Sequence, residues 1–101
     1  MATRPSQVQT RHPDPGRSMP RIDRTVYEAF RKAILKIVPA SGDGLPFRDL
    51  APRVASRLPG AVRDSIGSVN WYATTVKLDL EARGEIERIP GSRPQRLRRK
   101  T

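Results

Sequence analysis

The chain has 101 residues, a formal net charge of +10 and no cysteine. This length suffices for one domain, and the absence of cysteine excludes a disulfide framework and a thiolate metal site. No apolar run is long enough for a signal peptide or a membrane span, so we expect a cytoplasmic protein that makes no membrane contact.

Residues 1–21 are predicted to form a disordered basic arm. They contain four prolines and, among Val, Ile, Leu and Phe, only Val8. Such a segment cannot bury enough apolar surface to offset the entropy lost on ordering. The only histidine, His12, lies in this arm, where we expect neither a metal-ligand nor a general-base role.

The first helix is predicted at about residues 24–38. Six apolar residues repeat there at helical spacing. Either Asp23 or Thr25 can cap the N-terminus of this helix, and Pro39 ends it. We interpret the helix as core scaffold whose basic residues form a solvated face.

A second helix is predicted at about residues 47–58. The preceding Leu45-Pro46 leaves room for a strand of one to three residues, of the kind that pairs with a hairpin. Pro52 conflicts with a helix interior unless Asp49 is the effective N-cap, because a proline in the first turn forfeits no intrahelical hydrogen bond.

Residues 61–67 are predicted to be a turn before the third helix. Val62 and Ile66 are its apolar members, and we expect them to cover the edge of the core. The turn is longer than the three or four residues of a compact helix-turn-helix.

The third helix is predicted at about residues 68–83. Ser68 can accept a hydrogen bond from a free amide of the first turn, and Gly84 can supply the left-handed residue that ends the helix. Its apolar residues recur at i, i+4, i+7 and i+11, which places them in one narrow stripe. They are Val69, Ala73, Val76 and Leu80.

A β-hairpin is predicted after the third helix, with strands at about residues 85–89 and 95–99. Pro90 and Pro94 cannot donate hydrogen bonds in a ladder, so they confine pairing to the segments that flank the turn. The resulting turn is stiffened by proline and carries Arg93.

The order of helix, short strand, two helices and hairpin resembles winged helix-turn-helix domains. The run WYATTVKLDLEARG at residues 71–84 is similar to a family of small bacterial winged-helix proteins of unknown function, in which paired aromatic residues precede a (V/Q)LDLEA(K/R)G pattern. The resemblance extends over about residues 22–99 and leaves residues 100–101 as a tail. It implies an α+β fold of three helices with a short β-hairpin wing, and it implies no activity.

Polar residues far from the apolar stripe of the third helix would face a nucleic-acid groove. Asn, Thr and Lys side chains hydrogen-bond base edges or phosphates, and arginines of a hairpin contact phosphates or enter a minor groove. Thr75 and Glu81 lie at the margin of this face. An ordinary polar helix face and a frayed basic C-terminus are the competing interpretations. The predicted nucleic-acid contacts are Asn70, Thr74, Lys77, Arg88, Arg93 and Arg96.

Trp71 and Leu78 lie on nearly the same side of the third helix, about opposite the apolar stripe. Three interpretations compete: cover by the N-terminal arm or the long turn, a dimer or partner surface, and contact of Trp71 with nucleic acid. Paired exposed apolar residues mark protein contacts more often than base readout, which favours the first two.

The distribution of charge bears on the choice of partner. Residues 22–91 contain 11 Lys and Arg against 9 Asp and Glu, so most of the excess positive charge lies in the two ends of the chain. Basic ends attract polyanions without specifying which one, and they also serve solubility. Acidic residues in the C-terminal half of the third helix favour docking through its N-terminal half.

No catalytic constellation, cofactor motif or metal-binding spacing is present, so we expect no enzyme activity. The sequence favours a nucleic-acid-binding, transcription-regulator-like bacterial protein, with double-stranded DNA as the partner and RNA as an alternative ligand. The rival hypothesis is a protein-interaction or homodimerisation module that uses Trp71 and Leu78 without binding nucleic acid.

Overall fold

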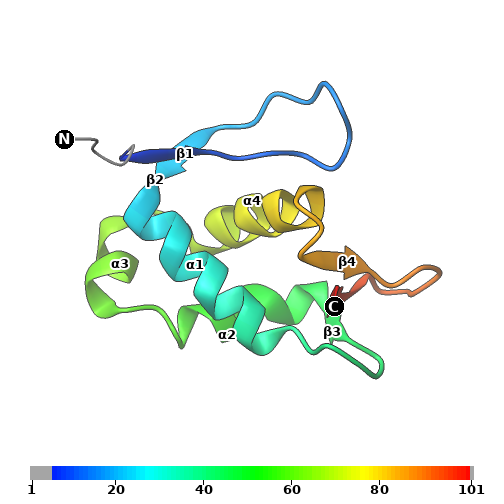
Figure 1. Cartoon of the computed structure of the whole chain (residues 1–101). Coiled ribbons are helices and arrows are strands. Elements are labelled where there is room, and N and C mark those ends of the chain that lie inside the picture. The colour runs from blue at the N-terminus through cyan, green and yellow to red at the C-terminus, as the bar shows by residue number, and fades with distance from the viewer. Residues whose placement is uncertain (1–5, 101) are drawn as a thin grey trace.

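The computed structural model describes residues 6–100, and the described residues form an α+β fold (Figure 1). The predicted α+β class is confirmed. The expectations for residues 1–5 and for Thr101 lie outside the described residues. In chain order the elements are β1 (Gln7–Gln9), β2 (Arg21–Asp23), α1 (Arg24–Ile37), β3 (Leu45–Pro46), the 3-10 turn η1 (Phe47–Asp49), α2 (Leu50–Ala55), α3 (Gly60–Ser65), α4 (Val69–Ala82), β4 (Ile86–Arg88) and β5 (Arg96–Arg99).

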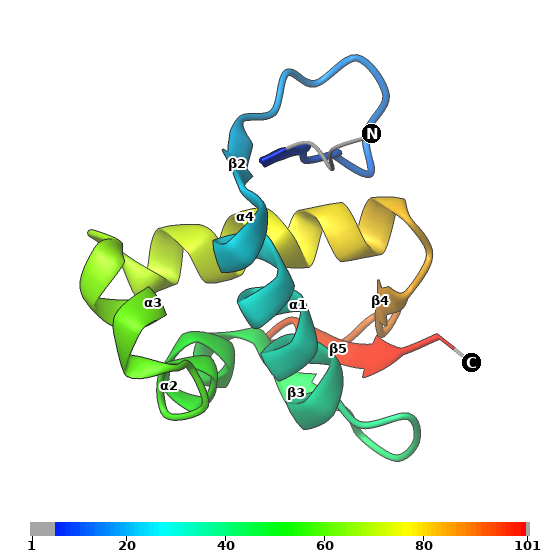
Figure 2. The ribbon, with the colours of Figure 1, turned by 60° about the vertical axis from the view of Figure 1, so that its left-hand side comes forward.

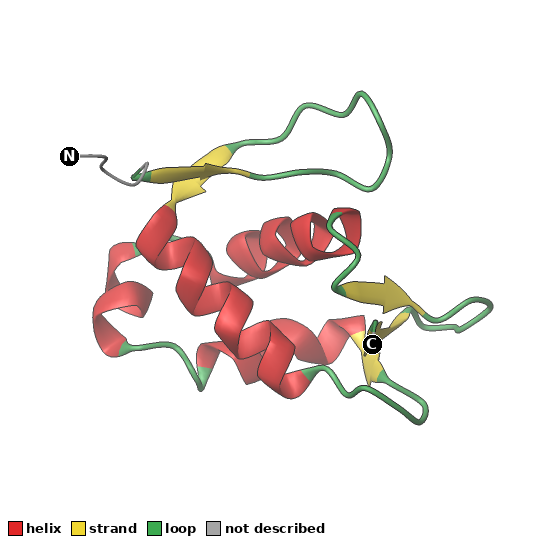
Figure 3. Cartoon of the chain, viewed as in Figure 1, coloured by secondary structure: helices red, strands yellow, loops and turns green. Residues whose placement is uncertain are grey.

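Two small antiparallel sheets flank the helices (Figure 3). Strands β1 and β2 form one sheet, and the other has the strand order β3–β5–β4. Helix α4 contacts both α1 and α2, and Figure 2 shows the two sheets on opposite sides of it. The side chains between these elements form one core, in which Phe30, Ile34, Leu50, Val54, Val76, Leu80 and Leu97 are fully buried.

The two long helices begin at residues that cap them. The Asp23 carboxylate accepts a hydrogen bond from the Val26 amide at 3.1 Å, and the Ser68 hydroxyl accepts one from the Trp71 amide at 3.1 Å. Each cap satisfies an amide that has no partner within its helix. Gly84 follows α4 with φ +77°, a left-handed conformation that favours glycine, and the chain then turns into β4.

The described residues form four α-helices, where the sequence predicted three. Residues 61–67, predicted to be a turn, contain most of α3, and the Pro59 carbonyl accepts hydrogen bonds from the amides of Val62 and Arg63. Val62 alone is buried in this helix, so the sequence carries no apolar repeat there. The predicted helix at 47–58 is likewise divided into η1 and a shorter α2, with Pro52 in the first turn of α2.

The three-stranded sheet closes the core beside the end of α4. The short strand β3 pairs with β5 as the sequence predicted, with Leu45 opposite Leu97, and β4 pairs with β5 on the other side. Leu45, Ile86 and Leu97 point into the core and are buried. The β4–β5 turn is held by the Ser92 hydroxyl, which accepts a hydrogen bond from the Arg96 amide at 3.0 Å.

The N-terminal segment differs from the disordered arm that its composition predicts. Strand β1 pairs with β2, and Val8 and Ile22 lie opposite each other with only 8% and 4% of their surfaces exposed. Both side chains join the core of the helices. The segment is therefore ordered because its few apolar residues are buried against the rest of the domain, a contact that composition alone does not reveal.

Candidate nucleic-acid interface

The N-terminal half of α4 presents an exposed face. Asn70 and Trp71 are exposed, and Thr74 and Leu78 are partly buried on the same side. Trp71 is 48% exposed and is the large apolar residue that the described part of the chain leaves most open. The ring centres of Trp71 and Tyr72 lie 4.9 Å apart in an edge-on arrangement, and the ring centres of Tyr72 and Phe30 lie 5.7 Å apart.

The prediction that Lys77 faces outward is wrong. The residue is 2% exposed, its Nζ lies 2.9 Å from Glu81 Oε2, and the same nitrogen lies 4.6 Å from the centre of the Phe47 ring. Burial lowers the pKa of the Lys77 ammonium, and the hydrogen bond and charge of Glu81 act in the opposite direction. Lys77 therefore belongs to the interior and does not reach a ligand that docks on the exposed face.

Two marginal residues of α4 are also enclosed. Thr75 is buried at 6% exposure, and the Glu81 side chain is 7% exposed between Lys77 and Arg88. The apolar stripe alone predicted a single buried face. A larger part of the circumference of α4 is buried, because η1 and the N-terminal hairpin also cover it.

The predicted hairpin arginines differ in their surroundings. Arg88 is exposed but its Nε donates to Glu81 Oε1 at 2.7 Å, whereas Arg93 is exposed at the β4–β5 turn and Arg96 is partly buried on β5. Arg98 pairs with Glu87 at 3.0 Å. Of the three predicted hairpin contacts, Arg93 and Arg96 therefore have no carboxylate partner among the described residues, whereas Arg88 has one.

A buried carboxylate in α4 joins three parts of the chain. Asp79 is fully buried; its Oδ1 accepts a hydrogen bond from the Arg11 amide at 2.8 Å, and its Oδ2 accepts from Arg83 Nε at 2.8 Å and from the Tyr27 hydroxyl. The hydrogen bond to Asp79 raises the pKa of the Arg83 guanidinium. This network fixes the start of the β1–β2 loop against α4.

The sequence interpretation did not single out Asp79 as a structural centre. The available signal was an aspartate between two leucines in a helix, with an arginine four residues later. Buried carboxylates are rare unless they are paired and hydrogen-bonded. Its partners in the N-terminal segment lie too far along the chain for spacing to reveal them.

Comparison with known proteins identifies the domain but gives no function. The model of a family of unknown function, DUF6958, matches residues 7–97. The chain belongs to this family. A search of curated proteins and a search of solved structures each returned no match.

The segment matched to DUF6958 runs from β1 into β5. It includes the N-terminal hairpin, Asp79 and the β4–β5 turn. The hairpin therefore belongs to the family's domain, and the expected resemblance to a family of unknown function is confirmed over a longer segment than the sequence pattern indicated.

Within this DUF6958 domain the described residues offer no evident metal site. No group of three or more His, Cys, Asp or Glu residues between positions 6 and 100 is arranged to hold a metal ion. His12 lies in the β1–β2 loop, where its Nδ1 accepts a hydrogen bond from the Asp14 amide at 2.9 Å. The helices in this range are all too short or too polar to cross a membrane.

The wild type is expected to lose stability above pH 10 because of Tyr27, and the Tyr27→Phe variant should lack this loss. Burial, and then the hydrogen bond to Asp79, raise the pKa of Tyr27 above its ordinary value of about 10. In the folded state the hydroxyl thus keeps its proton at a pH where the unfolded chain releases it. The stabilisation from this raised pKa is complete well below pH 10, and above pH 10 it falls with a slope that approaches about 1.4 kcal/mol per pH unit.

Urea unfolding of both proteins between pH 8 and pH 11 measures this difference. The advantage of the wild type over Tyr27→Phe should shrink by about 1 kcal/mol between pH 10 and pH 11, since all other titrating groups are shared. An advantage that stays constant over this range would contradict a raised pKa for Tyr27.

Proposed function

We propose that the protein is a winged-helix nucleic-acid-binding protein with a transcription-regulator-like role and duplex DNA as its ligand. The observation that carries the proposal is the arrangement of α1, β3, α2, α4, β4 and β5, in which the short strand β3 pairs with the hairpin. The additional helix α3 lies between α2 and α4. This order agrees with the resemblance that the sequence suggested.

In this proposal α4 docks through its N-terminal half. Asn70 and Thr74 there can hydrogen-bond base edges or phosphates, and Ser68 caps this end of the helix. The C-terminal half is less accessible, because Pro13 and Asp14 of the β1–β2 loop border a hollow that is also lined by Glu81 and Arg88. Lys77 plays no part in the contact.

The β4–β5 hairpin supplies phosphate contacts. It follows α4 directly and carries Arg93 at its turn and Arg96 on β5. Guanidinium groups bind phosphate through paired N–H donors. Because such contacts release counterions from the duplex, the affinity should fall steeply with salt.

Fluorescence anisotropy with a labelled 20-base-pair duplex tests this function. We expect the wild type to bind at low salt, and the double variant Arg93→Gln/Arg96→Gln to bind about tenfold more weakly, with a salt slope smaller by about two. The matched control is Lys32→Gln/Lys36→Gln, which makes the same change in net charge at exposed positions of α1 beside Arg57 and Pro59. The control should change the affinity less than twofold.

Two outcomes would contradict the proposal. One is no binding of the wild type to duplex DNA even at low salt. The other is an equal loss in both double variants, because it would trace the affinity to net charge alone. A parallel titration with duplex RNA of the same sequence distinguishes the two nucleic acids.

The exposure of Trp71 favours a second candidate function, a protein contact or homodimer. An exposed tryptophan with a partly buried leucine two turns further along the same side of the helix is typical of an interaction surface. Sedimentation of the wild type and Trp71→Ala decides the homodimer form: a dimer that the substitution converts to a monomer supports it, and a monomeric wild type refutes it.

A further inference from the structure

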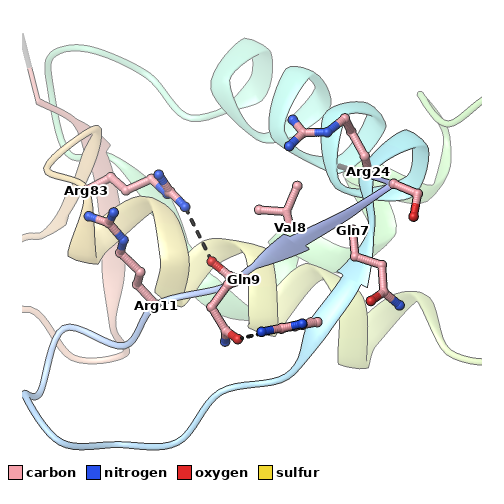
Figure 4. A pocket seen from close by; sticks show the side chains of 8 residues that line it. Gln7, Val8, Gln9, Arg11, Arg24 and Arg83 are labelled. Atoms are coloured by element: carbon pink, nitrogen blue, oxygen red, sulfur yellow. Dashed lines mark hydrogen bonds between the residues drawn. The ribbon is translucent and has the colours of Figure 1, made fainter. Parts of the chain in front are cut away.

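A basic hollow lies between the N-terminal hairpin, the start of α1 and the end of α4. Its volume is about 640 Å³, and it opens to solvent. Figure 4 shows Arg11, Arg24 and Arg83 reaching it from three different parts of the chain around strand β1. The described residues that line it are Ser6, Gln7, Val8, Gln9, Arg11, Arg21, Arg24 and Arg83.

The lining is strongly positive. Four of the eight described residues are arginines and none is Asp or Glu. Carboxylates compensate this charge only from outside the lining: Asp79 pairs with Arg83 at 2.8 Å, and Glu28 pairs with Arg24 at 3.4 Å. An anion in the hollow would therefore meet several guanidinium groups and no opposing carboxylate.

Arg11 and Arg21 are the cations that carboxylates leave uncompensated. Arg21 Nε donates to the neutral side-chain amide of Gln9 at 3.2 Å. Within residues 6–100 the Arg11 guanidinium has no hydrogen-bond or ion-pair partner, although its backbone amide is held by Asp79. The backbone at Arg11 is thus fixed while its charge stays available, which is an arrangement suited to a ligand.

The chemistry of the lining favours phosphate as the ligand. Guanidinium groups present planar pairs of N–H donors that match phosphate oxygens. Small-molecule pockets are mostly apolar and enclosed, whereas seven of the eight described residues that line this hollow are polar or charged, and it is open to solvent. Gathering like charges also raises the energy of the folded protein unless an anion offsets it.

We propose that Arg11, Arg21, Arg24 and Arg83 form a binding site for phosphate groups, and that their source is the backbone of a bound nucleic acid. The choice of nucleic acid rests on the proposed function. A small phosphorylated molecule has the same chemistry and is the other source to be tested. In either case the β1–β2 hairpin is part of a binding surface, and the Asp79 network holds it in place.

The double variant Arg11→Gln/Arg21→Gln tests this site without touching the pairs made by Arg24 and Arg83. Its affinity for the 20-base-pair duplex should fall about tenfold and its salt slope by about two, as expected for the loss of two phosphate contacts. Lys32→Gln/Lys36→Gln again supplies the same change in net charge elsewhere and should alter the affinity less than twofold. A second variant, Arg11→Lys/Arg21→Lys, keeps the charge and removes only the paired donors.

AMP supplies the second arm of the experiment. Its titration is followed through the side-chain Nε–Hε resonances of the arginines, which should shift for the four residues of the hollow if the phosphate binds there. The duplex and AMP are each titrated into the full-length wild-type protein and into every variant.

The outcomes separate the two proposals. Duplex binding that is lost selectively in Arg11→Gln/Arg21→Gln supports the site, whereas a change of less than twofold in this variant, as in the control, overturns the site and leaves the proposed function standing. AMP shifts without duplex binding support the site with a small-molecule source and refute the proposed function. Neither duplex binding nor AMP shifts would overturn both. If the glutamine variant does not fold, an unchanged affinity of the lysine variant overturns recognition by the guanidinium pairs.

Discussion

Replacing Asp79 with alanine is expected to lower the free energy of unfolding by about 3–5 kcal/mol, the usual cost of removing one partner from a buried charged pair. The fully buried carboxylate accepts hydrogen bonds from the Arg11 amide, Arg83 Nε and the Tyr27 hydroxyl. All three donors lose their acceptor at once. Domains of this size have a total stability of about the same magnitude, so the variant should be largely unfolded at room temperature.

Urea unfolding followed by circular dichroism at 222 nm measures this loss. Tyr27→Phe is the matched control: it removes one of the three donors but keeps the carboxylate with its other two partners, and it should cost about 1 kcal/mol. Asp79→Asn keeps the shape and should be folded enough for amide exchange, in which the Arg11 amide should exchange faster than in the wild type. A cost below about 1 kcal/mol for Asp79→Ala would contradict the central role of this carboxylate.

Replacing Gly44 with alanine is expected to cost about 3 kcal/mol or more, by forcing β3 away from β5. Gly44 has φ +76°, and a Cβ built on it would lie 2.5 Å from the Leu97 carbonyl oxygen and 2.6 Å from Ile89 Cδ1. The Ile89 side chain can move, but the carbonyl belongs to the central strand of the sheet. Both the backbone conformation and the space therefore require glycine.

Gly42→Ala separates these two causes. Gly42 has nearly the same conformation, with φ +79°, but a Cβ there would meet no atom within 4 Å. Gly42→Ala should lower the free energy of unfolding only by the cost of the left-handed backbone conformation, about 1–2 kcal/mol. Urea unfolding of both variants measures the difference, and equal losses would contradict the close approach of Gly44 to β5.

The candidate interface could be predicted only in part from the sequence. Asn70 and Trp71 are exposed on α4 as the apolar stripe indicates, and Arg93 is exposed at the hairpin turn. Lys77 is buried because Phe47 of η1 packs against its ammonium group, a contact that the periodicity of α4 does not describe, and Glu81 one turn along the same helix pairs with it. The arginine-lined hollow was missed altogether, since its residues come from segments far apart in the chain.

Local chemistry in the sequence determined the central elements of the fold. Apolar periodicity and capping residues placed helices at about residues 24–38 and 68–83, and the structure has Arg24–Ile37 and Val69–Ala82. These signals act between residues a few positions apart, so they can be read without the fold.

Tertiary contacts alone decided the order of the N-terminal segment, the surroundings of Lys77 and the gathering of arginines around β1. Val8 is buried only because the helices provide a surface for it. The backbone of Arg11 is fixed only because its amide donates a hydrogen bond to Asp79, which lies 68 positions further along the chain. No local pattern encodes such pairings, because their free energy comes from groups that meet only when the chain has folded.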